Sequence, residues 1–124
     1  MPSLRSEKRI LWFEELGKED IPLVGGKNAN LGEMIKTKIP VPTGFAITAH
    51  SYHEFIMQTG IAEKIYRIIG ETVNDVNNPR QFEEASKKIR RLIESTPMPP
   101  QIDRAIRDSY AELRKQTKTT EAFV

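Results

Sequence analysis

The segment with the clearest chemical potential is Val24-Gly25-Gly26-Lys27-Asn28, where an apolar stretch, two glycines and a lysine precede a predicted helix. Glycines let backbone amides approach a ligand closely, a helix N-terminus carries partial positive charge, and Lys27 adds a full charge. Polyphosphate is the ligand that gains most from this combination. The spacing is neither that of a P-loop nor Gly-x-Gly-x-x-Gly. A tight turn with a solvated lysine is the alternative, because isolated Gly-Gly turns are common.

Two other sets of polar residues could also do chemistry. His50 and His53, with Glu54, lie at the start of a predicted helix at a spacing that can hold a metal ion on one face. A third ligand has no obvious place, so we interpret the histidines as surface residues. Asp20 and Glu33 flank the Gly-Gly-Lys turn. As single carboxylates, we interpret them as solubilising groups rather than acid–base catalysts.

The basic run Lys87-Lys88-Ile89-Arg90-Arg91 could contact nucleic acid. Ile89, however, belongs to an apolar series at core spacing, which favours a solvated helix face. The pairs Glu83–Lys87 and Glu84–Lys88 have the (i, i+4) spacing of ion pairs on an exposed helix.

The elements that must position these residues divide the chain into two parts. Residues 1–60 have a mixed α/β pattern: we predict a strand over 10–13, a helix over 28–36, a strand over 45–47 and a helix after Thr48 that ends at Gly60. The prolines of the segment 39–44 exclude a helix there. Trp12 and Phe13 are expected in the core.

Residues 61–117 have a helical pattern with three apolar stripes. The stripes are Ile61, Ile65, Ile68 and Ile69; Phe82, Ala85, Ile89, Leu92 and Ile93; and Ile102, Ile106, Tyr110 and Leu113. The proline-containing segments 77–79 and 97–100 separate them. Residues 118–124 end on Ala122-Phe123-Val124, which we interpret as the start of a strand. The predicted fold class is therefore α+β and mostly helical.

Composition restricts the function classes. The 124 residues carry 19 Lys and Arg against 17 Asp and Glu, a net charge of +2, which argues against a dedicated nucleic-acid binder. The absence of cysteine excludes disulfides, thiolate nucleophiles and thiolate zinc sites. No apolar run approaches the roughly 18–20 residues that cross a bilayer. We therefore expect a cytoplasmic protein without membrane partners.

Five segments, taken in their order along the chain, indicate a protein family more specifically than these patterns do. The segments are 12–16 (Trp-Phe-Glu-Glu-Leu), 24–35 (Val-Gly-Gly-Lys-Asn-Ala-Asn-Leu-Gly-Glu-Met-Ile), 39–48 (Ile-Pro-Val-Pro-Thr-Gly-Phe-Ala-Ile-Thr), 90–97 and 105–110. In this order they resemble the opening of the phosphoenolpyruvate synthase family, within a wider group that includes pyruvate phosphate dikinase and rifamycin phosphotransferase. The Gly-Gly-Lys-Asn-Ala form resembles the synthases more than their relatives.

The resemblance implies a partial ATP-grasp-like nucleotide-binding domain, with residues 1–124 as its N-terminal portion. It implies a parent enzyme that makes phosphoenolpyruvate, AMP and phosphate from ATP, pyruvate and water, with magnesium and a phosphohistidine. Among the family's nucleotide-contacting residues only the lysine of Gly-Gly-Lys maps onto this chain, at Lys27, where it would neutralise ATP phosphates. The metal ligands and the phosphohistidine have no counterparts here, so neither His50 nor His53 is assigned that role.

Three functional hypotheses follow. In the first, the chain contributes part of the ATP-phosphate site, binds ATP weakly and is inactive alone. In the second, it is a helical interaction module without catalysis, which self-associates or docks onto the remainder of the enzyme through exposed apolar surface. In the third, it is a small nucleic-acid-binding domain; this rests only on residues 87–91.

Overall fold

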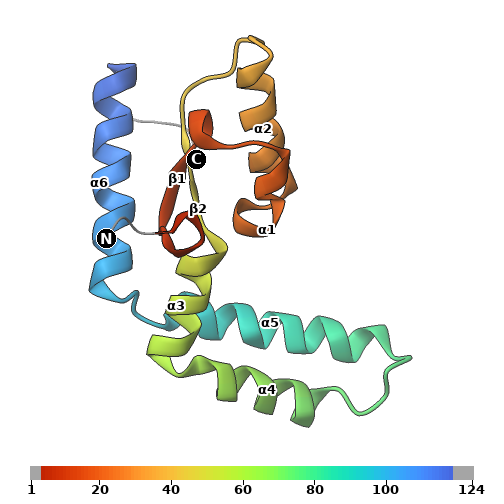
Figure 1. The fold of residues 1–124 in the computed structure, drawn as a ribbon. Helices are drawn as coiled ribbons and strands as arrows, with labels where there is room; N and C mark the ends of the chain where they lie inside the picture. Colours follow the sequence, from red (N-terminus) through yellow and green to blue (C-terminus); the bar gives the residue numbers. More distant parts are fainter. Residues whose placement is uncertain (1–3, 119–124) are drawn as a thin grey trace. The chain divides into compact units, whose positions relative to one another are not determined.

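The computed structural model describes residues 4–118, which form two compact units. The first unit contains residues 4–53 and 100–118, and the second contains residues 54–99. Two short strands and six α-helices make up most of the described chain (Figure 1), which confirms the mostly helical α+β prediction. None of the helices described is long and apolar enough to span a membrane.

The boundaries of the two units do not coincide with residue 60, where the sequence pattern changes from mixed α/β to helical. Helix α6 (Pro100–Thr117) belongs with the N-terminal elements and lies beside strand β1, although its sequence resembles that of the helices before it. Ile102 and Leu113 of α6 are buried.

Strands β1 (Ile10–Trp12) and β2 (Phe45–Ile47) form a two-stranded antiparallel sheet. The register pairs Ile10 with Ile47, Leu11 with Ala46, and Trp12 with Phe45. The Trp12 and Phe45 rings pack at a centroid distance of 5.4 Å, a favourable cross-strand aromatic pair. The strand predicted at 45–47 has these bounds. Phe13, predicted as strand, instead begins the 3₁₀ turn Phe13–Glu15.

The hydrogen bonds at the two ends of the sheet define which backbone groups face outward. The Phe13 N–H donates to the Gly44 carbonyl at 2.9 Å, and the Thr48 N–H donates to the Arg9 carbonyl at 3.0 Å. Antiparallel pairs alternate between hydrogen-bonded and non-hydrogen-bonded, so Leu11 and Ala46 form the bonded pair between these two. The N–H and C=O groups of Phe45 and Ile47 therefore point away from β1.

Helix α2 (Gly26–Lys36) packs against the segment that follows β1. Its start at Gly26 is two residues earlier than predicted. The hydrophobic core of the first unit contains five buried residues: Leu11, Leu16, Val24, Ala29 and Ala46. Gly32 allows the close approach, because a Cβ there would lie 2.4 Å from the Leu16 carbonyl oxygen and 2.5 Å from the Leu16 Cβ.

Helix α3 (Ala49–Thr59) begins where the sequence predicts, at a threonine cap. The Thr48 Oγ1 accepts a hydrogen bond from the Ser51 N–H at 3.2 Å and donates to the Lys8 carbonyl at 2.5 Å. Gly60, with a φ of 69°, ends the helix in the left-handed region. Phe55 is buried as predicted, whereas Tyr52 on the predicted apolar side is 58% exposed.

The second unit is built around the hairpin of α4 (Ile61–Thr72) and α5 (Pro79–Ser95). Asn78 caps α5 by accepting a hydrogen bond from the Arg80 N–H at 3.0 Å, and Pro79 occupies the first turn. The predicted pairs Glu83–Lys87 and Glu84–Lys88 form at 3.5 and 3.1 Å. The charged residues of the basic run, Lys87, Lys88, Arg90 and Arg91, are exposed, as expected for a solvated face.

The close contact at Gly32 predicts the effect of adding one methyl group. We expect Gly32→Ala to lower the free energy of unfolding by about 1–3 kcal/mol, because the Cβ overlaps Leu16 backbone. Urea unfolding followed by the fluorescence of Trp12, the single tryptophan, reports on this unit. The control is Gly70→Ala in α4, where a Cβ meets no described atom within 4 Å. By far-UV circular dichroism that variant should be about 0.5–1 kcal/mol more stable. Equal effects of the two substitutions would contradict the packing argument.

Candidate nucleotide-binding groove

Lys27 lies in the first turn of α2 with an exposed side chain. Gly25 joins the preceding short helix α1 (Ile21–Val24) to α2: its N–H donates to the Ile21 carbonyl at 2.8 Å, and its carbonyl accepts from the Ala29 N–H at 3.1 Å. Its φ of 83° is a left-handed value that favours glycine. The apolar segment before the glycines is therefore a helical turn.

The start of α2 is open to a ligand. The amides of Gly26, Lys27 and Asn28 precede the first intrahelical bond, so the helix itself supplies them with no acceptor. A Cβ at Gly25 or at Gly26 would meet no described atom within 4 Å. Among residues 4–118, no carboxylate forms an ion pair with Lys27. The predicted combination of accessible amides and a free cation is therefore present in the structure.

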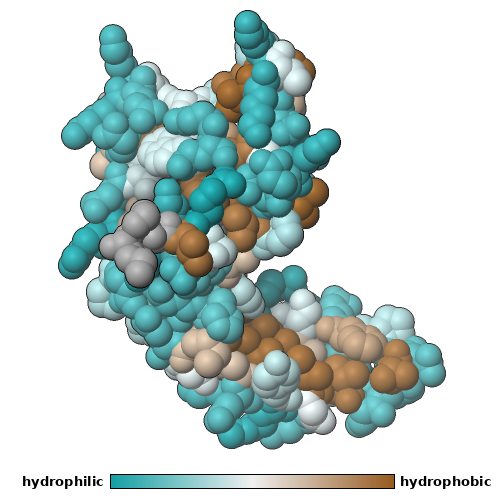
Figure 2. Space-filling model, in the orientation of Figure 1, coloured by the Kyte–Doolittle hydropathy of each residue, from teal (hydrophilic) through white to brown (hydrophobic). Residues whose placement is uncertain are grey.

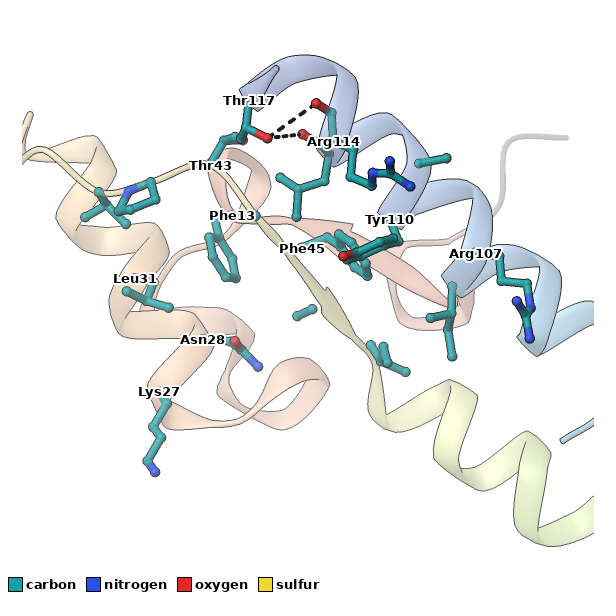
Figure 3. A pocket seen from close by; sticks show the side chains of 18 residues that line it. Phe13, Lys27, Asn28, Leu31, Thr43, Phe45, Arg107, Tyr110, Arg114 and Thr117 are labelled. Atoms are coloured by element: carbon teal, nitrogen blue, oxygen red, sulfur yellow. Dashed lines mark hydrogen bonds between the residues drawn. The ribbon is translucent and has the colours of Figure 1, made fainter. Parts of the chain in front are cut away.

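A groove of about 1350 Å³ adjoins this turn in the first unit. Lys27, Asn28 and Leu31 of α2 line one wall, β2 and the residues before it line the base, and α6 lines the other wall (Figure 3). The lining is mainly apolar and includes three aromatic side chains, from Phe13, Phe45 and Tyr110.

The charged residues of the groove are all basic. Besides Lys27, the wall formed by α6 contributes Arg107 and Arg114, and no carboxylate from the described residues lines it. Arg107 donates to the Asp103 carboxylate at 2.9 Å, so its charge is partly compensated. An apolar groove with basic side chains suits a ligand with an apolar ring and an anionic group.

The sequence analysis did not identify the two arginines. Arg107, Tyr110 and Arg114 follow helical spacing, which could have indicated one face of α6. This face lies opposite α2 because residues about 80 positions apart along the sequence pack in the same unit, and the spacing within α6 does not predict such packing.

The interpretation of Asp20 as a solubilising group was wrong. Asp20 is 2% exposed, and its carboxylate accepts hydrogen bonds from Arg5 at 2.8 and 3.0 Å and from the Gly17 N–H at 2.9 Å. Arg5 also donates to the Glu15 carbonyl. The carboxylate therefore fixes the turn Lys18–Asp20, which leads directly into α1 and the Gly-Gly-Lys segment.

Burial by itself would raise the pKa of Asp20, since it disfavours the charged carboxylate. Hydrogen bonds from Arg5 and Gly17, together with the charges of Arg5 and Lys36, outweigh burial and lower the pKa below its ordinary value of 3.8. The same pairing raises the pKa of Arg5.

The remaining candidate residues lie apart from the groove. Glu33 lies on α2, where its carboxylate accepts from the Lys18 N–H at 3.2 Å and pairs with Lys36 at 3.7 Å. His50 is half-buried and His53 exposed, both on α3. Within residues 4–118, no cluster of three or more His, Asp or Glu side chains could hold a metal ion. Ala122-Phe123-Val124 lies outside the described residues.

Comparison with known proteins identifies the family of the chain. Residues 21–124 match the family model of the pyruvate phosphate dikinase AMP/ATP-binding domain, and the chain therefore belongs to that family.

Curated relatives extend the comparison. The chain is 50% identical over 117 residues to a probable phosphoenolpyruvate synthase of Staphylothermus marinus, covering 94% of this chain and 14% of that protein. It is 50% identical over 104 residues to the phosphoenolpyruvate synthase of Aeropyrum pernix, covering 84% of this chain and 13% of that protein. The Escherichia coli phosphoenolpyruvate synthase is 40% identical over 112 residues, which are 87% of this chain and 14% of that protein. The chain thus spans about one seventh of the length of these relatives.

The geometry of Asp20 predicts how stability depends on pH. A carboxyl whose pKa is lowered by folding stabilises the folded state above its ordinary pKa, and this contribution is lost as the pH falls from there through the folded value. Unfolding in urea, followed by Trp12 fluorescence from about pH 7 to about pH 3, should show this loss. Asp20→Asn should lower the free energy of unfolding at neutral pH by about 1–3 kcal/mol and flatten the acid limb.

Glu14→Gln, at an exposed carboxylate close in sequence, is the matched control and should leave the pH profile unchanged. A profile of Asp20→Asn that still falls as steeply as that of the unchanged chain would contradict the assigned role of the buried carboxylate.

Proposed function

We propose that this chain forms the N-terminal portion of the nucleotide-binding domain of a phosphoenolpyruvate synthase. The overall reaction would make phosphoenolpyruvate, AMP and phosphate from ATP, pyruvate and water, as the family resemblance implies. The membership of the AMP/ATP-binding family, together with the free Lys27 beside accessible helix amides, is the observation that carries the proposal. Within the wider group, the identities to three phosphoenolpyruvate synthases favour the synthase over a dikinase or a rifamycin phosphotransferase.

Lys27 has the role of binding phosphate. Its ammonium group and the first amides of α2 can together neutralise the charge of a polyphosphate. ATP bound here would supply the phosphoryl group for the reaction. The aromatic and apolar lining of the groove suits the adenine ring, and Arg114 adds positive charge on the facing wall. The ATP-grasp relationship of the domain, its magnesium dependence and its place in the cytoplasm remain parts of the same proposal.

We expect no phosphoryl transfer by residues 1–124 alone. In the resembled family, the acidic metal ligands, the phosphohistidine and the pyruvate-binding barrel lie in segments beyond the matched residues. These residues would therefore contribute one side of the ATP site, and affinity for ATP should be weak.

ATP titration tests the role of Lys27. We expect a dissociation constant above about 1 mM, equivalent to a binding free energy no better than about −4 kcal/mol. Backbone amide shifts of Gly26 and Lys27 should follow the titration, and Lys27→Ala should weaken binding about tenfold or more through loss of a charged contact. Lys36→Ala, at the other end of the same helix, is the matched control and should bind as the unchanged chain does.

Equal affinity in Lys27→Ala and the unchanged chain would contradict the phosphate-binding role. Micromolar binding that Lys27→Ala abolishes would support that role and show a more complete site than proposed. Formation of AMP in the same samples would contradict inactivity alone.

The α4–α5 hairpin favours a second candidate function, that of an interaction module. Apolar side chains lie at its surface, as Figure 2 shows along the hairpin: Tyr66 is 74% exposed, Phe82 49% and Ile69 41%. A two-helix hairpin buries few residues by itself, so a partner surface would cover these side chains. That partner would be the remainder of the enzyme or a second copy of this chain.

Light scattering distinguishes these partners. If the hairpin self-associates, the mean mass should rise with protein concentration, and the double variant Ile69→Glu with Phe82→Glu should remain monomeric. Ile21→Glu, an equivalent change at a 50% exposed isoleucine of the first unit, is the control and should associate as before. A monomer at all concentrations would exclude self-association and leave the remainder of the enzyme as the partner.

A further inference from the structure

The junction between α1 and α2 lacks one hydrogen bond that a continuous helix would have. In an uninterrupted helix each N–H donates to the carbonyl four residues earlier, so the Asn28 N–H would donate to the Val24 carbonyl. Gly25, with a φ of 83°, breaks the helix at this point. Regular bonding resumes one residue later, where the Ala29 N–H donates to the Gly25 carbonyl at 3.1 Å. Within the described chain no backbone N–H donates to the Val24 carbonyl.

The side chain of Asn28 takes the place of its own backbone N–H. Its Nδ2 donates to the Val24 carbonyl at 2.9 Å, in a contact that is partly buried. A carbonyl oxygen only accepts hydrogen bonds, so the amide nitrogen rather than Oδ1 must face it. The last carbonyl of α1 is thereby satisfied, while the Asn28 backbone N–H stays available in the first turn of α2.

This substitution of a side chain for a backbone donor affects the charge that an anion meets at the turn. An unsatisfied carbonyl at the end of α1 would present partial negative charge near the first amides of α2. The Asn28 side chain satisfies that carbonyl, and it leaves α2 in a different direction from the exposed side chain of Lys27 (Figure 3). A backbone in which α1 continued into α2 would instead engage the Asn28 N–H and remove one amide from the anion site.

We infer that Asn28 is a positioning residue for phosphate at the Gly-Gly-Lys turn, through its hydrogen bond to the Val24 carbonyl. The inference rests on the proposed phosphate-binding role of Lys27. Asn28 keeps α1 and α2 as two separate helices, so the first amides of α2 remain free for the anion that Lys27 neutralises. Alanine at position 28 lacks the side-chain donor and favours a continuous helix, so it would disturb this arrangement.

Titration with inorganic tripolyphosphate, followed by the backbone amide shifts of Gly26 and Lys27, tests this role. Tripolyphosphate has no ring, so its binding reports on the turn and not on the apolar groove. Asn28→Ala should weaken its binding about fivefold or more. Asn28→Gln keeps a carboxamide donor that is long enough to reach the Val24 carbonyl, and it should bind more tightly than Asn28→Ala. Asn30→Ala, at an exposed asparagine of the same helix, is the matched control and should bind as the unchanged chain does.

The outcomes separate this inference from the proposed function. Equal affinity in Asn28→Ala and the unchanged chain, together with a loss in Lys27→Ala, would overturn the inference and leave the proposed function intact. Equal affinity in all three chains, or no binding of tripolyphosphate, would contradict both together. Equal losses in Asn28→Ala and Asn28→Gln would also overturn the inference, because restoring the donor would then have no effect.

A second measurement needs no variant. In the unchanged chain the Val24 carbonyl holds the side-chain amide of Asn28, so that amide should exchange with water about tenfold more slowly than the side-chain amide of Asn30. The Asn28 backbone amide should exchange rapidly. Equal exchange of the two side chains would overturn the inference even if a variant failed to fold. So would a protected Asn28 backbone amide, which would show that α1 continues into α2.

Discussion

The buried carboxylate of Asp20 is the interaction on which the arrangement of the first unit depends. Water is excluded from it, so it must be compensated within the protein, and Arg5 and the Gly17 amide provide this. The pair of Arg5 with Asp20 joins the N-terminal turn Arg5–Glu7 to the residue immediately before α1. The position of the Gly-Gly-Lys segment therefore follows from a charge pair rather than from the glycines themselves. The glycines supply only the local conformation and the open access.

Close packing carries this constraint from α2 to the sheet. Gly32 lets α2 approach Leu16, and Ala29 and Leu16 share one core with Leu11 and Ala46. The same core thus fixes both α2 and β2, two of the three walls of the groove. Because protein interiors pack densely, a shift of α2 would also disturb the packing of Leu11 and Ala46 of the sheet. Lys27 and β2 are therefore positioned by the same set of contacts.

The two units bury their apolar surface in different ways. The first places the small sheet among helices that come from both ends of the described chain. The second is a hairpin whose helices have strong apolar stripes but bury few side chains, chiefly Ile61 and Ala85. The relatives that the chain matches are about seven times as long.

Local patterns in the sequence determined the strand at Phe45–Ile47, the Thr48 cap, the three long helices and the chemistry available at Lys27, because propensity and periodicity act within a few residues. Only the tertiary structure decided that Asp20 is buried, since its partner Arg5 lies fifteen residues away and a single carboxylate carries no signal of burial. Tertiary packing likewise placed α6 beside β1 and so brought Arg107 and Arg114 opposite Lys27. Such contacts depend on which apolar faces meet, and a one-dimensional pattern does not contain that information.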